Sequence, residues 1–292
     1  MQDRDEPDDE ASPLDVGTVV HHALEDFFGR HLGRSPNRPW TDTDLTVARD
    51  ILDSHAARLA DEGKAGRPLV WATTTRRMRR SVRRTLLADT RRRRSRRASP
   101  EAVELTFGLQ DAAQPAVEVE LANGATVALR GSIDRVDVHE DGSLTVLDWK
   151  TGKRDAYDAL AKEPLNLVDR GRHLQLPLYA EAALAWHGRP AAVNAYYVFV
   201  DHGADELGGA VDENQQARLH DALQTLTFGV AEGLFPMNPG DDGYFGWTHC
   251  GFCPFDRLCP SSRRIQWDAI REDPALSDYV ALTEPTVKED AQ

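Results

Sequence analysis

The chain has 292 residues, of which 40% are hydrophobic, and a formal net charge of −13 at pH 7. This length and composition predict a soluble globular protein with one large domain or two modest ones. No stretch approaches the roughly 18 consecutive apolar residues of a membrane span, and the acidic start of the chain differs from a secretory signal, so we expect a cytoplasmic protein with no membrane partner. The sequence also contains no P-loop motif, so nucleotide hydrolysis is not expected.

The basic residues are concentrated in one segment. Twelve arginines and a single acid, Asp89, lie between Arg76 and Arg97, so this segment carries +11 and the rest of the chain about −24. Basic residues that neutralise phosphate supply much of the affinity for nucleic acid. We therefore predict a DNA-binding stripe on a repelling body, with a solvated helix face as the alternative. The acidic, lysine-poor composition resembles that of proteins from halophilic microbes.

Three helices are predicted in the first hundred residues. The segment 14–32 has apolar residues at helical spacing, and a second helix is expected over 42–62. The arginine-rich segment continues as a third helix, because Met78, Val82 and Leu86 repeat every four residues and form an apolar stripe.

The pattern changes to period two from residue 101 to 150, with Asn-Gly and Glu-Asp-Gly turns between the apolar runs, which predicts antiparallel strands. Downstream, the order of predicted elements is a helix over 170–187, a strand over 192–200, a possible strand near 207–211, a helix over 212–230, and a cysteine-bearing loop.

The segment "VLDWKTG" places an acid and a base in an apolar strand. Successive strand side chains alternate between faces, so Asp148 and Lys150 point the same way, with Leu147 and Trp149 behind them. A structural ion pair at a strand end would explain the two charges equally well. The register of the neighbouring hairpin is therefore needed to distinguish a structural from a functional role for Asp148 and Lys150.

The hairpin has two possible registers. A two-residue turn would put Asp134 and Asp148 on opposite faces, whereas a three-residue loop over 140–142 would put them directly opposite each other. The second register also pairs Val136 with Val146 on the same face, so the apolar residues agree with it. We therefore expect the two carboxylates to face each other.

Facing carboxylates need compensation. Their Cβ atoms are about 4.5–5.5 Å apart, and like charges at that separation are destabilising. A divalent cation with oxygen ligands, Mg²⁺ or Mn²⁺, is the natural compensation. Lys150 would then be placed to orient or help deprotonate an attacking water.

These motifs resemble a known family. "GSIDRVD" followed by "VLDWKTG" resembles the PD-(D/E)XK nuclease superfamily, in particular the RecB-like branch found in AddB-type and RecB-type helicase–nucleases. The histidine helix "GTVVHHALE" precedes these two motifs, and the post-catalytic "QLPLY" and the signature "CGFCPFDRLC" come after them. All the motifs occur in the family's order, and the resemblance extends over about 14–272.

The resemblance implies an α/β fold with a restriction-endonuclease-like core, a mixed central sheet flanked by helices, and a C-terminal cysteine-bearing loop. It implies metal binding by His21, Asp134, Asp148 and the Trp149 carbonyl, a role for Lys150 at the attacking water, and support from Gln175 and Tyr179. His22 is the main risk of misassignment, because it lies about 100° further round the helix. The DNA-binding residues we assign are Arg76, Arg77, Arg79, Arg80, Arg83 and Arg84.

The expected function is that of a Mg²⁺- or Mn²⁺-dependent deoxyribonuclease, exonucleolytic rather than endonucleolytic, within a DNA repair or recombination helicase–nuclease. DNA and a helicase subunit or domain are the expected partners. The alternatives are a stand-alone exonuclease like those of CRISPR adaptation, and a DNA-binding scaffold without catalysis.

The chain has three cysteines, Cys250, Cys253 and Cys259. Three cysteines cannot all pair as disulfides, and their close spacing favours a metal or iron–sulfur site. In the resembling family these three join a fourth, upstream cysteine to hold a 4Fe–4S cluster. This sequence has no upstream cysteine, so we expect a fragment or reduced relative in which the cluster is incomplete. A labile three-cysteine site and an assembled cluster are both open, with His249 as a candidate substitute ligand.

We divide the chain into three parts. An acidic extension covers 1–13, and a nuclease domain covers 14–272. That domain contains the catalytic sheet and helix over 98–201 and the cysteine loop over 246–262. A tail covers 273–292.

Overall fold

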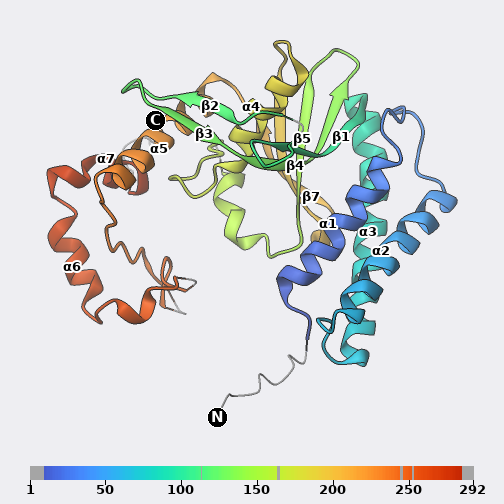
Figure 1. Ribbon diagram of the computed structural model, residues 1–292, viewed down its shortest axis with the longest axis horizontal. Helices are drawn as coiled ribbons and strands as arrows, with labels where there is room; N and C mark the ends of the chain where they lie inside the picture. Colours follow the sequence, from blue (N-terminus) through green and yellow to red (C-terminus); the bar gives the residue numbers. More distant parts are fainter. Residues whose placement is uncertain (1–9, 113, 163–164, 244–245, 252, 285–292) are drawn as a thin grey trace.

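The computed structural model describes residues 10–112, 114–162, 165–243, 246–251 and 253–284. At its centre is a five-stranded sheet (Figure 1). From one edge to the other its strands are β1 (Ala98–Phe107), β4 (Gly131–His139), β5 (Leu144–Lys150), β6 (Val193–Phe199) and β7 (Asp205–Ala210). Strands β5 and β6 run parallel, and the other neighbouring pairs are antiparallel. The sheet is therefore mixed, as the sequence predicts.

Two short antiparallel ribbons accompany this sheet. Strands β2 (Val117–Glu120) and β3 (Thr126–Leu129) enclose the predicted Asn-Gly turn, in which Gly124 has a φ of +80°. Strands β8 (Asp242–Gly243) and β9 (Gly246–Trp247) lie in the C-terminal region.

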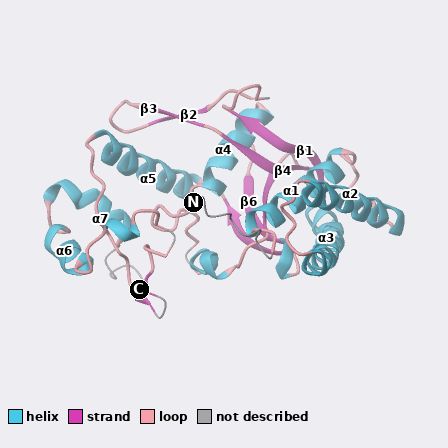
Figure 2. Ribbon diagram, turned by 60° about the horizontal axis from the view of Figure 1, so that its bottom comes forward, coloured by secondary structure: helices cyan, strands magenta, loops and turns pink. Residues whose placement is uncertain are grey.

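Helices cover both faces of the central sheet (Figure 2). One face packs against α1 (Pro13–Gly29), α2 (Asp42–Asp61) and α3 (Pro68–Arg96), and the other against α4 (Gln175–His187). The C-terminal region contains α5 (Glu213–Ala231), α6 (Arg263–Ile270) and α7 (Ser277–Thr283). Short 3-10 helices are η1 (Asp155–Ala161), η2 (Val200–His202), η3 (Asp256–Leu258) and η4 (Pro274–Leu276). No helix in these described ranges is long and apolar enough to cross a bilayer.

The helix predicted from residue 170 begins later, at Gln175. Asp169, Arg170 and Gly171 have φ values of +40°, +58° and +79°. Consecutive left-handed residues cannot belong to a right-handed helix, so the chain turns here and α4 starts after the turn. The prediction of a helix over 170–174 was wrong, because apolar periodicity does not reveal such a turn.

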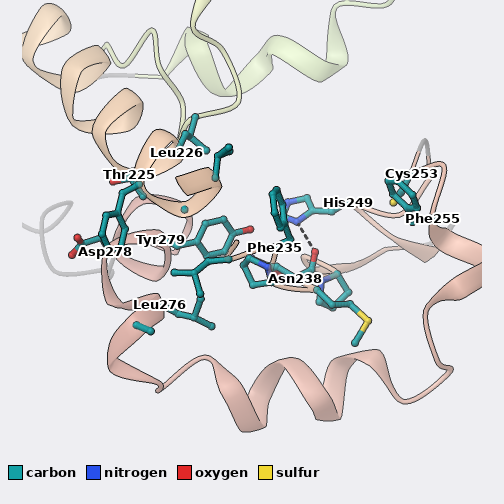
Figure 3. A pocket seen from close by; sticks show the side chains of 18 of the residues that line it. Thr225, Leu226, Phe235, Asn238, His249, Cys253, Phe255, Leu276, Asp278 and Tyr279 are labelled. Carbon is teal, nitrogen blue, oxygen red and sulfur yellow. Dashed lines mark hydrogen bonds between the residues drawn. The ribbon is translucent and has the colours of Figure 1, made fainter. Parts of the chain in front are cut away.

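Part of the segment predicted to be a C-terminal tail, residues 273–292, forms helices. Helix α7 follows η4, and Leu282 packs against a small apolar cluster that includes Leu219 and Leu223 of α5. A cavity of about 760 Å³ opens between the end of α5, the segment 234–239 and α7, and Figure 3 shows Leu226, Phe235 and Tyr279 around it. The first part of the predicted tail is therefore helical, and residues 285–292 lie outside the described ranges.

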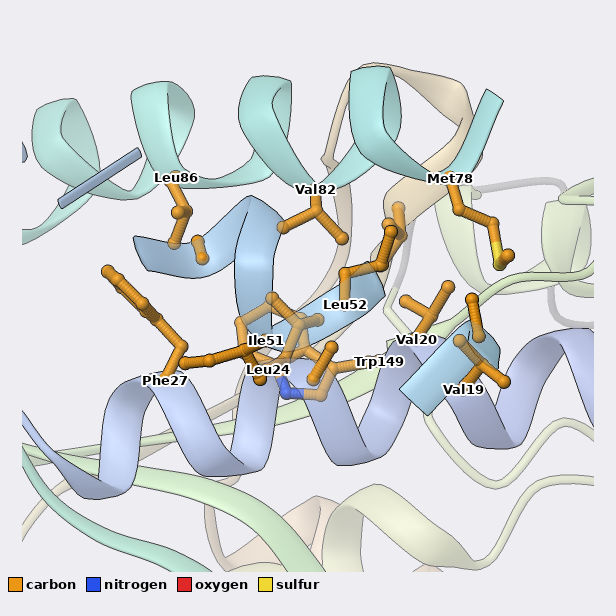
Figure 4. Close-up of a cluster of buried hydrophobic side chains, with 14 of the residues drawn as sticks. Val19, Val20, Leu24, Phe27, Ile51, Leu52, Met78, Val82, Leu86 and Trp149 are labelled. Carbon is orange, nitrogen blue, oxygen red and sulfur yellow. The ribbon is translucent and has the colours of Figure 1, made fainter. Parts of the chain in front are cut away.

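The larger apolar core joins the three N-terminal helices to the sheet (Figure 4). The predicted stripe of Met78, Val82 and Leu86 is confirmed, because each of these side chains is at most 2% exposed. Figure 4 shows the stripe facing Leu24 of α1 and Trp149 of β5. Burial of this stripe turns the opposite, arginine-rich side of α3 toward solvent, and it holds α1 against the strand that carries Asp148.

Candidate active site

The hairpin between β4 and β5 adopts the register with the three-residue loop. The His139 amide donates to the Ser143 carbonyl at 2.9 Å, and Gly142 has a φ of +85°. Val136 pairs with Val146, and both are fully buried. The register prediction is confirmed, because glycine readily adopts the left-handed conformation that such a loop needs.

Asp134 and Asp148 lie one step beyond the last paired residues, Arg135 and Leu147. At this point the Trp149 amide donates to Asp134 Oδ2 at 2.5 Å, so a side chain takes the place of a partner-strand carbonyl. The pairing of β4 with β5 therefore stops where two carboxylates face each other, as the sequence predicts.

Helix α1 brings a histidine to the same strand edge. His21 donates from Nδ1 to Asp134 Oδ1 at 3.2 Å, whereas the His22 ring lies beside His55 of α2, with centroids 5.6 Å apart. Burial lowers the pKa of His21, but the hydrogen bond and charge of Asp134 outweigh it, so the pKa lies above its ordinary value. His21, and not His22, is the histidine at the site.

A close helix–strand contact sets the position of His21. A Cβ atom built on Gly17, one turn before His21, would lie 3.0 Å from Thr151 Oγ1, directly after β5. Glycine therefore lets α1 approach the end of β5 more closely than a larger residue would.

Asp148 and Lys150 form a tight pair. Lys150 Nζ lies 2.6 Å from Asp148 Oδ2, and Asp148 is only 5% exposed. Burial raises the pKa of Asp148 to about 6; the Lys150 ammonium opposes this rise, and the charge of Asp134 adds to it. The site therefore holds more negative charge than its lysine balances.

Helix α4 supplies groups that hold the lysine. Lys150 Nζ donates to Gln175 Oε1 at 3.0 Å, and Gln175 Nε2 donates to the Tyr179 hydroxyl at 3.4 Å. Burial raises the pKa of Tyr179, and the charge of Asp148 adds to this rise, so the phenol remains protonated. Gln175 thus contacts the ammonium group of Lys150 directly, and Tyr179 contacts Gln175.

Two residues at this edge were not expected from the sequence. Tyr197 pairs with Asp148 across β5 and β6, donates to Gln175 Oε1 at 3.4 Å, and has its ring 5.0 Å from Lys150 Nζ. In the sequence Tyr197 is simply a tyrosine in an apolar strand. Tyrosine is common in buried strands, so nothing marked it as a site residue.

Glu104 of β1 is the second unexpected residue. The register of β1 and β4 places it opposite Asp134, it is exposed, and its φ is +45°. A left-handed conformation for a residue with a Cβ costs about 1–3 kcal/mol and is often found at functional sites. The sequence shows only a single glutamate in a predicted strand. It does not reveal that this strand pairs with β4, so it does not predict that Glu104 lies near Asp134.

The side chains at this edge suit a divalent cation, although they are paired with one another. No three His, Cys, Asp or Glu side chains in the described ranges converge closely enough to hold a metal. Asp134 is bonded to His21, and Asp148 Oδ2 is buried without a hydrogen bond, in ionic contact with Lys150. Excess carboxylate charge beside an imidazole is a donor set that Mg²⁺ or Mn²⁺ accepts. The residues therefore fit the expected ion.

The cysteine loop does not form a comparable site. Cys250, Cys253 and Cys259 are free thiols at the edge of the 760 Å³ cavity (Figure 3). The expected substitute, His249, is instead hydrogen-bonded from Nδ1 to the Asn238 carbonyl at 3.2 Å. The expected iron–sulfur cluster is therefore not supported by the described part of this loop.

The chain is similar in sequence to known nuclease subunits. The family model of the PD-(D/E)XK nuclease superfamily matches residues 2–260. A subunit of the ATP-dependent helicase/deoxyribonuclease of Desulforamulus reducens is 30% identical over 242 residues, which cover 75% of this chain and 19% of the relative. The corresponding subunit from Acetivibrio thermocellus is 32% identical over 179 residues, covering 58% of this chain and 14% of the relative.

The mixed sheet with its paired carboxylates and following lysine has the architecture of a nuclease fold. The chain belongs to the PD-(D/E)XK nuclease superfamily, and its relatives place it in the RecB-like branch, as the motifs predict. It spans less than a fifth of the length of these relatives. Neither the relatives nor the structure supports the expectation of a halophilic origin.

Proposed function

We propose that this chain is a Mg²⁺- or Mn²⁺-dependent deoxyribonuclease that forms the nuclease part of a DNA repair or recombination helicase–nuclease. The observation that carries the proposal is that Asp134 and Asp148 lie opposite each other just beyond the paired part of β4 and β5, with Lys150 ion-paired to the second carboxylate. His21 completes this set from α1. The relatives named as helicase/deoxyribonuclease subunits support both the substrate and the helicase partner.

The chemistry is divided among the residues at this edge. His21, Asp134, Asp148 and the Trp149 carbonyl would hold the ion, which supplies charge neutralisation at phosphorus and a more acidic water. Lys150 orients the attacking water and can exchange a proton with it. Gln175 and Tyr197 fix the direction of the ammonium group through their contacts with Nζ and with each other.

The exposed half of α3 is the proposed DNA-binding surface. The six arginines assigned from the sequence are all exposed: Arg76, Arg77, Arg79, Arg80, Arg83 and Arg84. Four arginines further along have partners instead, because Arg92 and Arg96 pair with Glu206, Arg93 with Asp89, and Arg97 with Glu140. The predicted stripe is therefore divided: in its first half only Arg79 forms an ion pair, with Asp53, among the described residues.

We further propose that residues 14–272 form the nuclease domain and that cleavage proceeds from DNA ends. The catalytic sheet and helix over 98–201 supply the site residues other than His21, which comes from α1, and the cysteines of the loop over 246–262 line the 760 Å³ cavity instead. A DNA-binding scaffold without catalysis remains the second hypothesis, but the aligned carboxylates and lysine favour an enzyme.

The direct test is digestion of end-labelled DNA with and without Mg²⁺. Wild type should cleave only with the ion, and Lys150→Ala should lose about 10²–10⁴-fold in rate, the usual contribution of a positioned proton-transfer group. Lys153→Ala is the matched control, because Lys153 is an exposed lysine in the following loop. Equal rates for wild type and Lys150→Ala would refute the proposed site, and binding without cleavage by wild type would favour the scaffold.

A further inference from the structure

A groove lies between α2 and α3, on the outer side of the helical layer. Its volume is about 350 Å³. At about 30 Å³ per water molecule this is room for roughly ten waters, which is enough for a hydrated phosphodiester group. Its lining consists of Asp42, Leu45, Thr46, Ala48, Arg49, Leu52, Arg76, Arg79, Arg80, Val82 and Arg83.

The charge of this lining is strongly positive. Five arginines and one carboxylate face the groove, on a chain whose net charge is −13. Arg79 is paired with Asp53 at 2.6 Å, and Arg49 with its exposed neighbour Asp50 at 3.0 Å. The other three arginines form no ion pair with an acid in the described ranges, so their charges are available to a ligand.

The floor of the groove is apolar. Ala48 and Leu52 of α2 and Val82 of α3 lie beneath the arginines and are at most 2% exposed. Low-dielectric walls strengthen and focus the field of the charges above them. Guanidinium groups also hold phosphate oxygens through two parallel hydrogen bonds, which ammonium groups cannot do.

The arrangement of the arginines favours a polyanion over a single anion. Arg76, Arg80 and Arg83 follow one another at about one-turn spacing along the same side of α3, so their Cα atoms extend over about 10 Å of helix axis. A row of that length exceeds what one carboxylate or one free phosphate can occupy, and it matches a chain of repeating phosphates.

The helix that forms one wall of the groove packs against the helix that carries His21. Figure 4 shows Met78 of α3 over Val19 and Val20 of α1, and His21 follows directly after Val20. Arg79 and Arg80 directly follow Met78 on the exposed side of α3. The groove therefore lies on a helix that packs, through its other side, against the helix that carries His21.

We propose that the α2–α3 groove is a discrete binding site for the phosphodiester backbone of DNA, with Arg49 of α2 as a ligand opposite the arginines of α3. This inference rests on the proposed nuclease function, and it narrows the binding surface. Arg77 and Arg84 are exposed on the same half of α3 but do not line the groove. They should contribute less than Arg80 and Arg83, although their charge is the same.

The test compares pairs of substitutions of equal charge. Binding of a labelled single-stranded oligonucleotide is measured at several salt concentrations, with protein kept free of divalent metal so that the DNA stays intact. Arg80→Gln with Arg83→Gln should weaken binding about tenfold and make the salt slope shallower by about 1.4, since each single-strand phosphate contact contributes about 0.7. Arg77→Gln with Arg84→Gln should weaken it at most threefold.

A third pair controls for net charge. Arg91 and Arg94 are exposed on the second half of α3, outside the groove and outside the proposed DNA-binding set. Arg91→Gln with Arg94→Gln should leave the affinity within twofold of wild type. Arg49→Gln, on the other helix, should weaken binding severalfold, and an unchanged affinity in that variant would refute the groove.

Two further outcomes would overturn the proposed groove without bearing on the candidate active site. Equal losses for the Arg80/Arg83 and Arg77/Arg84 pairs would show a diffuse basic face, and no loss for the Arg80/Arg83 pair would show that DNA does not use the groove. Mg²⁺-dependent cleavage by wild type is measured separately. Groove-dependent binding without any cleavage would refute the nuclease proposal and leave the groove standing.

Discussion

Two ionic clusters lie on opposite sides of strand β4 and begin one residue apart. Asp134 joins the candidate active site, whereas Arg135 and Asp137 face α3, where they meet Asp89 and Arg93. This second cluster is buried and contains two acids and two arginines, with ion pairs of 2.5–2.8 Å. Its charges balance, and its ion pairs connect α3 to strand β4.

The charges of the first cluster do not balance. Lys150 pairs with Asp148 and the His21 imidazole with Asp134, and burial raises the pKa of Asp148 to about 6, so the single lysine does not compensate both carboxylates. Burial also raises the pKa of Asp89, but its two arginine partners outweigh that, so its pKa lies below the ordinary value. The comparison teaches that a buried charge cluster is structural when its charges cancel, and is a candidate site when a counter-ion is still needed.

The largest expected effect separates activity from stability. Asp148→Asn should lower cleavage at least about a thousandfold, because a bound metal contributes several kcal/mol at the transition state. Without metal, the Asp148→Asn variant should have a free energy of unfolding at least as large as that of wild type, because the substitution removes one of two facing like charges. Mg²⁺-dependent digestion and urea unfolding measure the two quantities. Cleavage at the wild-type rate would contradict the assignment of Asp148.

Arg135→Met should have the opposite profile. It leaves Asp89 and Asp137 buried without their shared partner, which should cost about 3–5 kcal/mol in the free energy of unfolding. Arg97→Ala is the control, because its ion pair with Glu140 is exposed and should contribute less than about 1 kcal/mol. Urea unfolding at pH 7 measures both variants, and equal losses would show that the buried cluster has no special structural role.

Acid should weaken the balanced cluster. The folded pKa of Asp89 lies below its unfolded value of about 3.9, so the unfolded state binds the proton more readily. Its stabilising contribution is complete above that unfolded pKa and is lost as the pH falls through the folded pKa. Wild type should therefore lose more unfolding free energy between pH 5 and pH 3 than Asp89→Asn, which has no proton to gain there. Parallel curves for the two proteins would contradict this prediction.

The smallest expected effect concerns the approach of α1. Gly17→Ala brings a methyl group to within 3.0 Å of Thr151 Oγ1, so α1 must move by a few tenths of an ångström and carry His21 with it. Cleavage should fall severalfold, with a stability change within about 1 kcal/mol. The double variant Gly17→Ala/Thr151→Ala removes the clash and should recover the activity. Failure to recover would mean that the glycine serves another purpose.

Local pattern determined much of this protein from the sequence. Strand alternation placed Asp148 and Lys150 on one face, and the Val136–Val146 match selected the register that brings Asp134 opposite. The apolar stripe of α3 was also correct, because side-chain periodicity follows directly from helix and strand geometry. Such patterns specify which side of an element is inside before its neighbours are known.

Only the tertiary structure decided which elements meet. The direction of α1 selected His21 over His22, and the packing of α3 assigned Arg93 to a buried network while leaving Arg80 exposed. Tyr197 and Glu104 reach the site through strand pairings between segments far apart in the sequence. The physical reason is that periodicity encodes the faces of one element, whereas a contact between elements depends on the combined packing of all of them.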